Sequence, residues 1–274
     1  RAARGRPVIF VELCAGTAAI TATLLGGRTL CPYLGGKSRQ AAEIIATLNM
    51  RTRLSRIVLV DAGEFGRTLA AVLDDSDKVC SYIEAWYDDD DRALYERLRT
   101  KAPASNRFER AAAHLYLQAR SYRGRPVAPE SDRWKVWGFD PEYRLSKTCA
   151  GPNSHARGWA TPRPVLAQRV RDFAALPWPT VDIIHGRAQG IVPIKDSACY
   201  IDPDYVGTVG YANGMPRADV IATAQKWDAC GSVVGVSEKE PIAALGWQTR
   251  AIGKVRSNTL GATQEWLTYN RAAQ

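Results

Sequence analysis

Short apolar runs recur along the chain and alternate with segments of helical periodicity. The runs are rich in β-branched residues and end at a polar residue or a glycine, which is typical of parallel strands buried on both faces. They lie at residues 8–13, 57–60, 181–184, 198–201 and 232–236. Apolar spacing of three or four predicts helices at residues 38–48, 63–73, 109–120 and 164–176. This alternation predicts an α/β fold with a Rossmann-like, doubly wound and mostly parallel sheet.

The alternating pattern breaks between about residues 91 and 162, which are rich in arginine, lysine, tryptophan and tyrosine. We therefore expect an inserted region at 91–162 within a main domain formed by 1–90 and 163–274. Interleaved cations and aromatic rings suit a surface that follows phosphates and stacks on bases. They equally suit a small core anchored by tryptophan, with cations extending to solvent. The candidate nucleic-acid contacts are Arg120, Tyr122, Arg123, Arg125, Arg133 and Lys135.

Composition narrows the function classes only slightly. The net charge of +9 favours polyanionic partners, because neutralising phosphates releases condensed counterions. The six cysteines are scattered without a CxxC pair, so we expect reduced thiols and no bound metal. No apolar run approaches the roughly 20 residues of a membrane helix, and no secretory signal is evident, so we expect no membrane association. The acidic run 88–91 is interpreted as a solvated turn leading into a helix rather than as a metal site.

The ends of the predicted strands carry the candidate chemistry, because ligands of such sheets bind beyond the carboxyl ends of strands. The first strand runs into a turn of small residues around Gly16, which would let backbone approach a ligand. The spacing is not GxGxxG, so a dinucleotide is not favoured. The second strand ends at Asp61, which could accept hydrogen bonds from a ribose or cap the following helix.

Two glycines, Gly35 and Gly36, precede Lys37 and a predicted helix. Bare amides and an ammonium would suit a carboxylate or a phosphate, although a plain turn before a helix explains the pattern equally well. It is not a Walker P-loop, which needs a longer glycine spacing.

A later strand ends in Asp202-Pro203-Asp204-Tyr205. The carboxylate of Asp202 and the carbonyl of Pro203 could both accept hydrogen bonds from one amino group, and Tyr205 could stack on a flat ring. Pro203 stiffens the turn and has no N–H. A plain Asp-Pro turn with a packed tyrosine is the alternative interpretation.

Together these motifs resemble the Dam-type and phage-type DNA N6-adenine amino-methyltransferases. Asp202-Pro203-Asp204-Tyr205 resembles their Asp-Pro-Pro-Tyr signature, and residues 10–19 are similar to their S-adenosylmethionine motif. Tyr33-Leu34-Gly35-Gly36-Lys37 resembles the aromatic-x-Gly-Gly-Lys segment. Residues 115–124 resemble the start of the target-recognition region, and Glu265-Trp266-Leu267 resembles the closing strand of phage and prophage members.

The resemblance implies a class I methyltransferase fold with an inserted target-recognition lobe, S-adenosylmethionine as cofactor and DNA as partner. It implies a catalytic loop of Asp202, Pro203, Asp204 and Tyr205 that binds the target base. It also implies a ribose contact at Asp61 and contacts from Tyr33 and Lys37 to the carboxylate and sulfonium side of the cofactor. The implied cofactor-binding residues are Phe10, Glu12, Leu13, Cys14, Ala15, Gly16, Thr17, Tyr33, Gly35, Gly36, Lys37, Asp61, Ala62 and Arg187.

Three departures from the family pattern bear on these roles. The Gly-Gly-Lys segment follows the cofactor motif here but precedes it in Dam itself, so Lys37 must reach the site through a different connection. Asp204 replaces the second proline, which loosens the loop and adds a charge. Arg187 stands where the family often has an acid, so another acceptor must serve the adenine amine of the cofactor.

The expected function is therefore adenine-N6 methylation of a flipped DNA base, by a monomer of relaxed specificity in the cytoplasm of a bacterial host cell. Restriction-modification is the expected setting. The alternatives are cytosine-N4 methylation, because both amines suit the same acceptors, and a non-catalytic DNA-binding or anti-restriction protein of the same fold.

Overall fold

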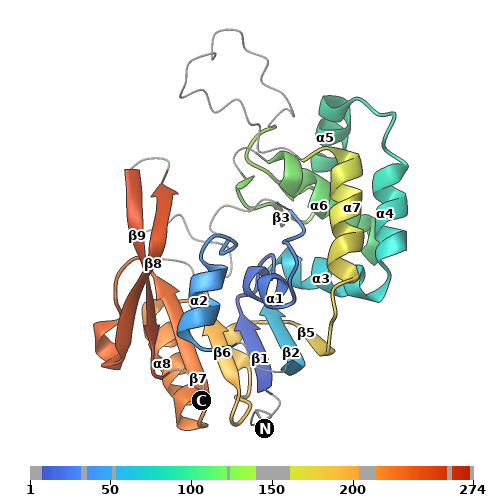
Figure 1. Ribbon diagram of the computed structural model, residues 1–274. Coiled ribbons are helices and arrows are strands. Elements are labelled where there is room, and N and C mark those ends of the chain that lie inside the picture. Colours follow the sequence, from blue (N-terminus) through green and yellow to red (C-terminus); the bar gives the residue numbers. More distant parts are fainter. Residues whose placement is uncertain are drawn as a thin grey trace. The chain divides into compact units, whose positions relative to one another are not determined.

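The computed structural model describes residues 8–31, 36–50, 54–121, 124–139, 161–203, 214–257 and 261–271. The chain forms two compact units, each described by itself (Figure 1). The first unit comprises Arg1–Gly27, Lys37–Gly66 and Pro177–Gln274. The second comprises Arg28–Gly36 and Arg67–Leu176, so the predicted insertion at 91–162 lies within a longer unit.

The first unit is built on a seven-stranded sheet with the order β5-β2-β1-β6-β7-β9-β8. Its strands are β1 (Val8–Leu13), β2 (Leu54–Asp61), β5 (Thr180–His185), β6 (Ala198–Ile201), β7 (Val233–Glu238), β8 (Gln248–Ser257) and β9 (Gly261–Tyr269). The pairs β1–β2, β1–β6, β2–β5 and β6–β7 are parallel. β9 lies antiparallel between β7 and β8. The strand order reverses between β1 and β6, the point where α/β sheets bind ligands.

The helices of the first unit cover both faces of this sheet. They are α1 (Ala19–Leu24), α2 (Ala41–Thr47) and α8 (Arg217–Ala229), with single 3₁₀ turns η3 (Ala188–Gly190) and η4 (Ala243–Leu245). The fourth helix, α3 (Glu64–Asp74), runs from the first unit into the second. α1 and α2 pack on one face and α8 on the other (Figure 1).

Strand alternation decides which face each side chain meets. On β1, Val11 and Leu13 pack in the core beneath α8, whereas Phe10 packs beneath α1 and α2. On β6, Cys199 and Ile201 face α8, and Tyr200 faces α1 and α2. The predicted Rossmann-like, doubly wound class I fold is confirmed.

The second unit is a set of helices with a short hairpin. It contains α4 (Ser76–Glu84), α5 (Asp91–Arg99), α6 (Arg107–Arg120), α7 (Arg163–Ala174), β3 (Ala128–Pro129) and β4 (Trp134–Lys135). Every residue of α6 from Ala111 to Arg120 is buried, because α4, α5 and α7 all pack against this helix. Asn106 caps it by accepting from the backbone N–H groups of Phe108 and Glu109.

Candidate active site

The carboxyl ends of β1, β2 and β6 are joined by backbone hydrogen bonds. The N–H of Ala15, just beyond β1, donates to the carbonyl of Val60 at 2.9 Å. The N–H of Asp202, just beyond β6, donates to the carbonyl of Leu13 at 3.2 Å. The turns that follow these strands therefore lie together at the point where the strand order reverses, as a ligand site of this fold requires.

The turn after β1 is folded in an unusual backbone conformation. Cys14, Gly16 and Ala18 have φ angles of 58°, 50° and 51°, in the left-handed region. A residue other than glycine costs about 1–2 kcal/mol in that region, so Cys14 and Ala18 are strained. Such strain collects at ligand sites. Ala15 and Thr17 of the same turn are buried, as are the strand residues Phe10 and Leu13, whose side chains form core contacts.

Glu12 fixes the helix that follows this turn. Its buried carboxylate accepts hydrogen bonds from the backbone N–H groups of Ile20 and Thr21, at 3.3 and 3.0 Å, and from the Thr21 hydroxyl at 2.6 Å. Burial raises the pKa of Glu12 to about 7, although these hydrogen bonds act in the opposite direction. The side chain of Glu12 is therefore committed to α1, and a role for its backbone in cofactor binding stays a prediction.

Asp61 connects the turns after β1 and β2. One carboxylate oxygen accepts from the N–H of Gly16 at 2.9 Å, and the other accepts from the N–H of Gly63 at 2.8 Å. Burial raises the pKa of Asp61, and these backbone hydrogen bonds partly offset the rise. The N–H of Gly66, in the first turn of α3, also hydrogen-bonds to this carboxylate, so Asp61 caps the helix as the second interpretation predicts. A carboxylate has about four acceptor sites, so a ribose contact at Asp61 remains compatible with these three bonds. Ala62 is half-buried beside it.

Lys37 binds two carboxylates from separate strands. Its ammonium lies 2.6 Å from Oδ1 of Asp202, beyond β6, and 3.2 Å from Oε1 of Glu265, on β9. The exposed fractions of the three side chains are 4% for Lys37, 19% for Asp202 and 1% for Glu265. Burial alone would lower the pKa of Lys37, but Asp202, then Tyr200 and Glu265, raise it well above its usual value. These neighbours therefore favour the protonated ammonium of Lys37.

Two hydroxyl groups extend this cluster. The Tyr200 hydroxyl donates to Ser237 Oγ at 2.9 Å, and the Ser237 hydroxyl donates to Oδ1 of Asp202 at 2.8 Å. Lys37 and Asp202 were each predicted from the sequence, whereas Ser237 and Tyr200 were not, and Glu265 was named only as part of a closing strand. Tyr200 within the run 198–201 and Ser237 directly after the run 232–236 are the polar residues that could have pointed to a network.

The other predicted site residues range from buried to exposed. Pro203 follows Asp202 and is buried. Gly36, next to Lys37, is half-buried. Arg187 is exposed at the start of η3 and makes no capping hydrogen bond there. Tyr33, Gly35, Asp204 and Tyr205 lie outside the described residues.

The predicted DNA-contacting residues divide between core and surface of the second unit. Arg120 is fully buried, lies 2.9 Å from Asp91 and has its guanidinium 5.8 Å from the Tyr116 ring centroid. The predicted DNA contact of Arg120 is therefore wrong, because its guanidinium is buried and paired with the carboxylate of Asp91. Tyr122 and Arg123 lie outside the described residues.

The surface members of this set gather around the hairpin. Arg133 and Lys135 are exposed, and the guanidinium of Arg125 lies 4.9 Å from the ring centroid of Trp137, which is 42% exposed. Trp134 is instead buried and stacks on His114. Trp134 therefore belongs to a small core, whereas a nucleic-acid contact at the exposed Trp137 stays a prediction.

The acidic run before α5 has the structural role favoured by the sequence. Asp90 caps α5 by accepting from the N–H of Ala93 at 2.8 Å, and Asp91 pairs with Arg120 and Arg163. Within the described ranges, histidine, cysteine and acidic side chains form no group suited to hold a metal ion. No helix in the described part of the chain has the length and apolar character needed to cross a membrane.

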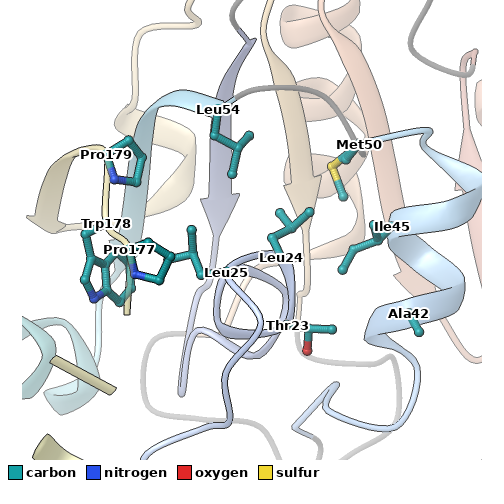
Figure 2. Close-up of a pocket in the computed structure, with 10 residues that line it drawn as sticks. All are labelled: Thr23, Leu24, Leu25, Ala42, Ile45, Met50, Leu54, Pro177, Trp178 and Pro179. Carbon is teal, nitrogen blue, oxygen red and sulfur yellow. The ribbon is translucent and has the colours of Figure 1, made fainter. Parts of the chain in front are cut away.

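An apolar pocket of about 600 Å³ lies elsewhere in the first unit (Figure 2). Its lining includes Leu54 at the start of β2 and Pro177, Trp178 and Pro179 immediately before β5. These are the amino ends of the strands, opposite to Asp61 and Asp202. The pocket has no titratable lining residue and does not belong to the candidate site.

Comparisons with known proteins add a distant structural similarity. The sequence matches no protein-family profile. It also matches no curated protein. The structure is similar to that of the rRNA methyltransferase aviRa from Streptomyces viridochromogenes, with a TM-score of 0.35 and 12% sequence identity. The match covers 97% of this chain and 77% of that one.

Proposed function

We propose that the protein is an S-adenosylmethionine-dependent DNA methyltransferase that modifies the N6 amine of adenine. The observation that carries the proposal is the position of Asp202. Its carboxylate lies where the strand order reverses, beside the strained turn after β1, and it is oriented by Lys37 and Ser237. An acceptor in this position suits an amino group brought to the carboxyl ends of β1 and β6.

The residues around this position fit the cofactor. Asp61 lies at the end of β2 and has acceptor capacity for ribose hydroxyls beyond its bonds to Gly16 and Gly63. The left-handed residues after β1 shape a turn of small side chains that would let a ligand approach the backbone. When bound, the cofactor would supply an electrophilic methyl group on a sulfonium.

An aromatic amine is a weak nucleophile, and hydrogen bonds to the acceptor groups would make it more reactive. Its lone pair is delocalised into the ring, and accepting both N–H bonds would favour a pyramidal nitrogen with an available lone pair. Asp202 and the carbonyl of Pro203 would be these acceptors, and Tyr205, by resemblance, would stack on the base. Positioning of this kind contributes up to about 7–11 kcal/mol in favourable cases. The base must leave the duplex, which costs a few kcal/mol, and stacking offsets about 1–3 kcal/mol of that.

A DNA partner is supported by charge and by the surface of the second unit. The chain carries a net charge of +9. Lys135 and Arg133 are exposed cations, although Arg133 pairs with Glu130, and the half-buried Arg125 lies over the exposed ring of Trp137. Cations suit phosphates, and an exposed indole suits an unstacked base.

The test identifies the methylated nucleoside. Purified protein is incubated with labelled cofactor and DNA of varied sequence, and the digested nucleosides are identified by mass. N6-methyladenine is expected from the wild type, none from Asp202→Ala, and wild-type amounts from the control Asp182→Asn. Asp182 is an acid on β5 that pairs with Arg56, remote from Asp202 along the sheet order.

Three results would redirect the proposal. N4-methylcytosine as the sole product would move the assignment to the cytosine alternative. Cofactor binding without methylation of any DNA would favour the non-catalytic alternative. Full transfer by folded Asp202→Ala would remove Asp202 from the chemistry.

A further inference from the structure

Four polar side chains project from neighbouring strands onto the same face of the sheet. Tyr200 packs on the α1 and α2 face, and Asp202 is two positions further along the chain. On β7 the side chains of Val234 and Val236 face α8, so Ser237 points the other way. On β9, Leu267 faces α1 and α2, and Glu265 shares that side by the same alternation.

Lys37 is brought to this cluster because it closely precedes α2, the helix that covers the same face. Its ammonium bridges Asp202 and Glu265 within a region where all three side chains are at least four-fifths buried. A buried cation of this kind is stable only with its carboxylates in place, because each charge compensates the desolvation of the other. The position of Lys37 is therefore determined by two strands and not by a flexible surface contact.

Two donors of the cluster, Lys37 and Ser237, act on the same oxygen of Asp202. Oδ1 lies 2.6 Å from the Lys37 ammonium and accepts the Ser237 hydroxyl at 2.8 Å. Ser237 is in turn oriented by the Tyr200 hydroxyl. With Oδ1 bonded twice, the carboxylate cannot rotate without breaking a buried ion pair, and Oδ2 is the oxygen left to face a ligand.

We infer that Lys37 is a positioning residue that fixes the Asp202 carboxylate through Oδ1, so that Oδ2 accepts the target amine, and that Glu265 orients Lys37. The inference rests on the proposed function, because it assigns Asp202 to the reacting amine. It replaces the role that sequence resemblance implies for Lys37, which was contact with the carboxylate and sulfonium side of the cofactor.

The first test separates these two roles of Lys37. Cofactor affinity is measured by calorimetry and the methyl-transfer rate by single turnover at saturating cofactor. Lys37→Met is expected to bind cofactor with wild-type affinity but to react about 10²-fold more slowly, the loss typical of a misplaced reacting group. Lys226→Met, an exposed lysine on α8, is the matched control and should leave both quantities unchanged.

Folding of the variant is addressed by a second substitution. Lys37→Met alone leaves Asp202 and Glu265 as two buried carboxylates without their cation, which is a strongly destabilising change. Lys37→Met/Glu265→Gln carries one negative charge fewer and should fold, with the same loss of rate. Glu265→Gln keeps an oxygen acceptor for Lys37 and should retain more of the wild-type rate than Glu265→Ala does.

A readout independent of catalysis monitors the Asp202 carboxylate itself. Its ¹³C NMR signal, identified by its loss in Asp202→Asn, is compared between wild type and the double variant at a single pH. Removal of the ammonium that lies 2.6 Å from Oδ1 should change the chemical shift of this carboxylate carbon.

The outcomes separate the two proposals. Cofactor affinity weakened tenfold or more with a wild-type rate at saturation would overturn the inference, and so would an unchanged chemical shift of the Asp202 carboxylate in the double variant. If the wild type methylates no DNA but this chemical shift changes, the proposed function fails while the pairing of Lys37 with Asp202 stands.

Discussion

The carboxylate of Asp61 accepts a hydrogen bond from the backbone N–H of Gly16, 45 positions earlier in the chain, at 2.9 Å. This contact joins the turn after β1 to the end of β2, and the second oxygen of Asp61 binds the N–H of Gly63. One side chain therefore sets the conformation of two turns at the candidate cofactor site.

Removing the Asp61 carboxylate should affect folding and cofactor binding together. Asp61→Ala leaves the backbone N–H groups of Gly16, Gly63 and Gly66 without this acceptor, and we expect the free energy of unfolding to fall by about 1–3 kcal/mol. Cofactor affinity, measured by calorimetry, should fall as well. Asp61→Asn keeps one oxygen acceptor and should lie between wild type and Asp61→Ala in both measurements. Wild-type affinity in folded Asp61→Ala would remove this residue from the cofactor site.

Glu12 should make stability depend on pH in the near-neutral range. Its pKa rises from 4.5 to about 7 on folding, so the folded protein binds this proton more tightly than the unfolded chain does. The associated stabilisation is fully present below about pH 4.5 and is lost as the pH rises to about 7. One pKa unit corresponds to 1.36 kcal/mol, so this contribution to the free energy of unfolding is on the order of 3 kcal/mol.

The substitution Glu12→Gln isolates this contribution from other groups that titrate. The amide side chain of the variant would keep an oxygen acceptor for α1 but cannot ionise. Denaturant unfolding should therefore show the variant gaining stability relative to wild type between about pH 4.5 and 7. A difference between the two proteins that stays constant across this interval would refute the assignment.

Substitution by alanine should lower protein stability at Arg120 but weaken DNA binding at Lys135. Arg120 is buried against Asp91, so Arg120→Ala should cost about 3 kcal/mol of stability without changing the salt dependence of DNA binding by the folded fraction. Lys135 is exposed on β4. Lys135→Ala should leave the melting temperature unchanged and lower the slope of log K against log salt by about 1. An unchanged slope for Lys135→Ala, measured by fluorescence anisotropy, would exclude this residue as a phosphate contact.

Gly66 should not tolerate a side chain, although it lies in a helix. A Cβ there would lie 2.7 Å from the carbonyl oxygen of Asp61, closer than packing permits. Gly66→Ala should therefore cost about 1–3 kcal/mol instead of gaining helix propensity. Gly190 in η3 has open space around its Cβ position, so Gly190→Ala should leave thermal unfolding unchanged. Equal melting temperatures for both variants would contradict the close approach at Gly66.

The buried strands could be predicted from the sequence because they are short apolar runs with clear ends. The predicted bounds 8–13 and 198–201 coincide with β1 and β6. β8 was missed, since an exposed edge strand with residues such as Gln248 and Arg250 has no apolar run. α8 was missed because polar Thr223 contributes to its buried face along with Val220, Ala224 and Trp227.

The candidate site was predictable where it follows a strand end and not where it depends on pairing between distant strands. Asp61 and Asp202 each follow an apolar run, and both lie at the carboxyl edge. Glu265 reaches Lys37 only because β9 inserts beside β7, which a linear pattern does not encode. Arg120 was predicted to lie at the surface because the arginines that follow it in sequence suggested a phosphate-binding segment. In the structure it belongs to the buried part of α6.

The outermost strand of the sheet, β8, has consequences for how the protein behaves at high concentration. A ten-residue edge offers unpaired backbone groups to any other molecule that can supply a strand. Two features oppose such association: the exposed cation Lys254, with Arg250 partly neutralised by its pairing with Glu43, and the register shift between Ala251 and Gly253, where the ladder is irregular. Replacing the cations of this strand with neutral residues would remove electrostatic repulsion between the β8 edges of two molecules. They would thereby favour aggregation of otherwise native molecules.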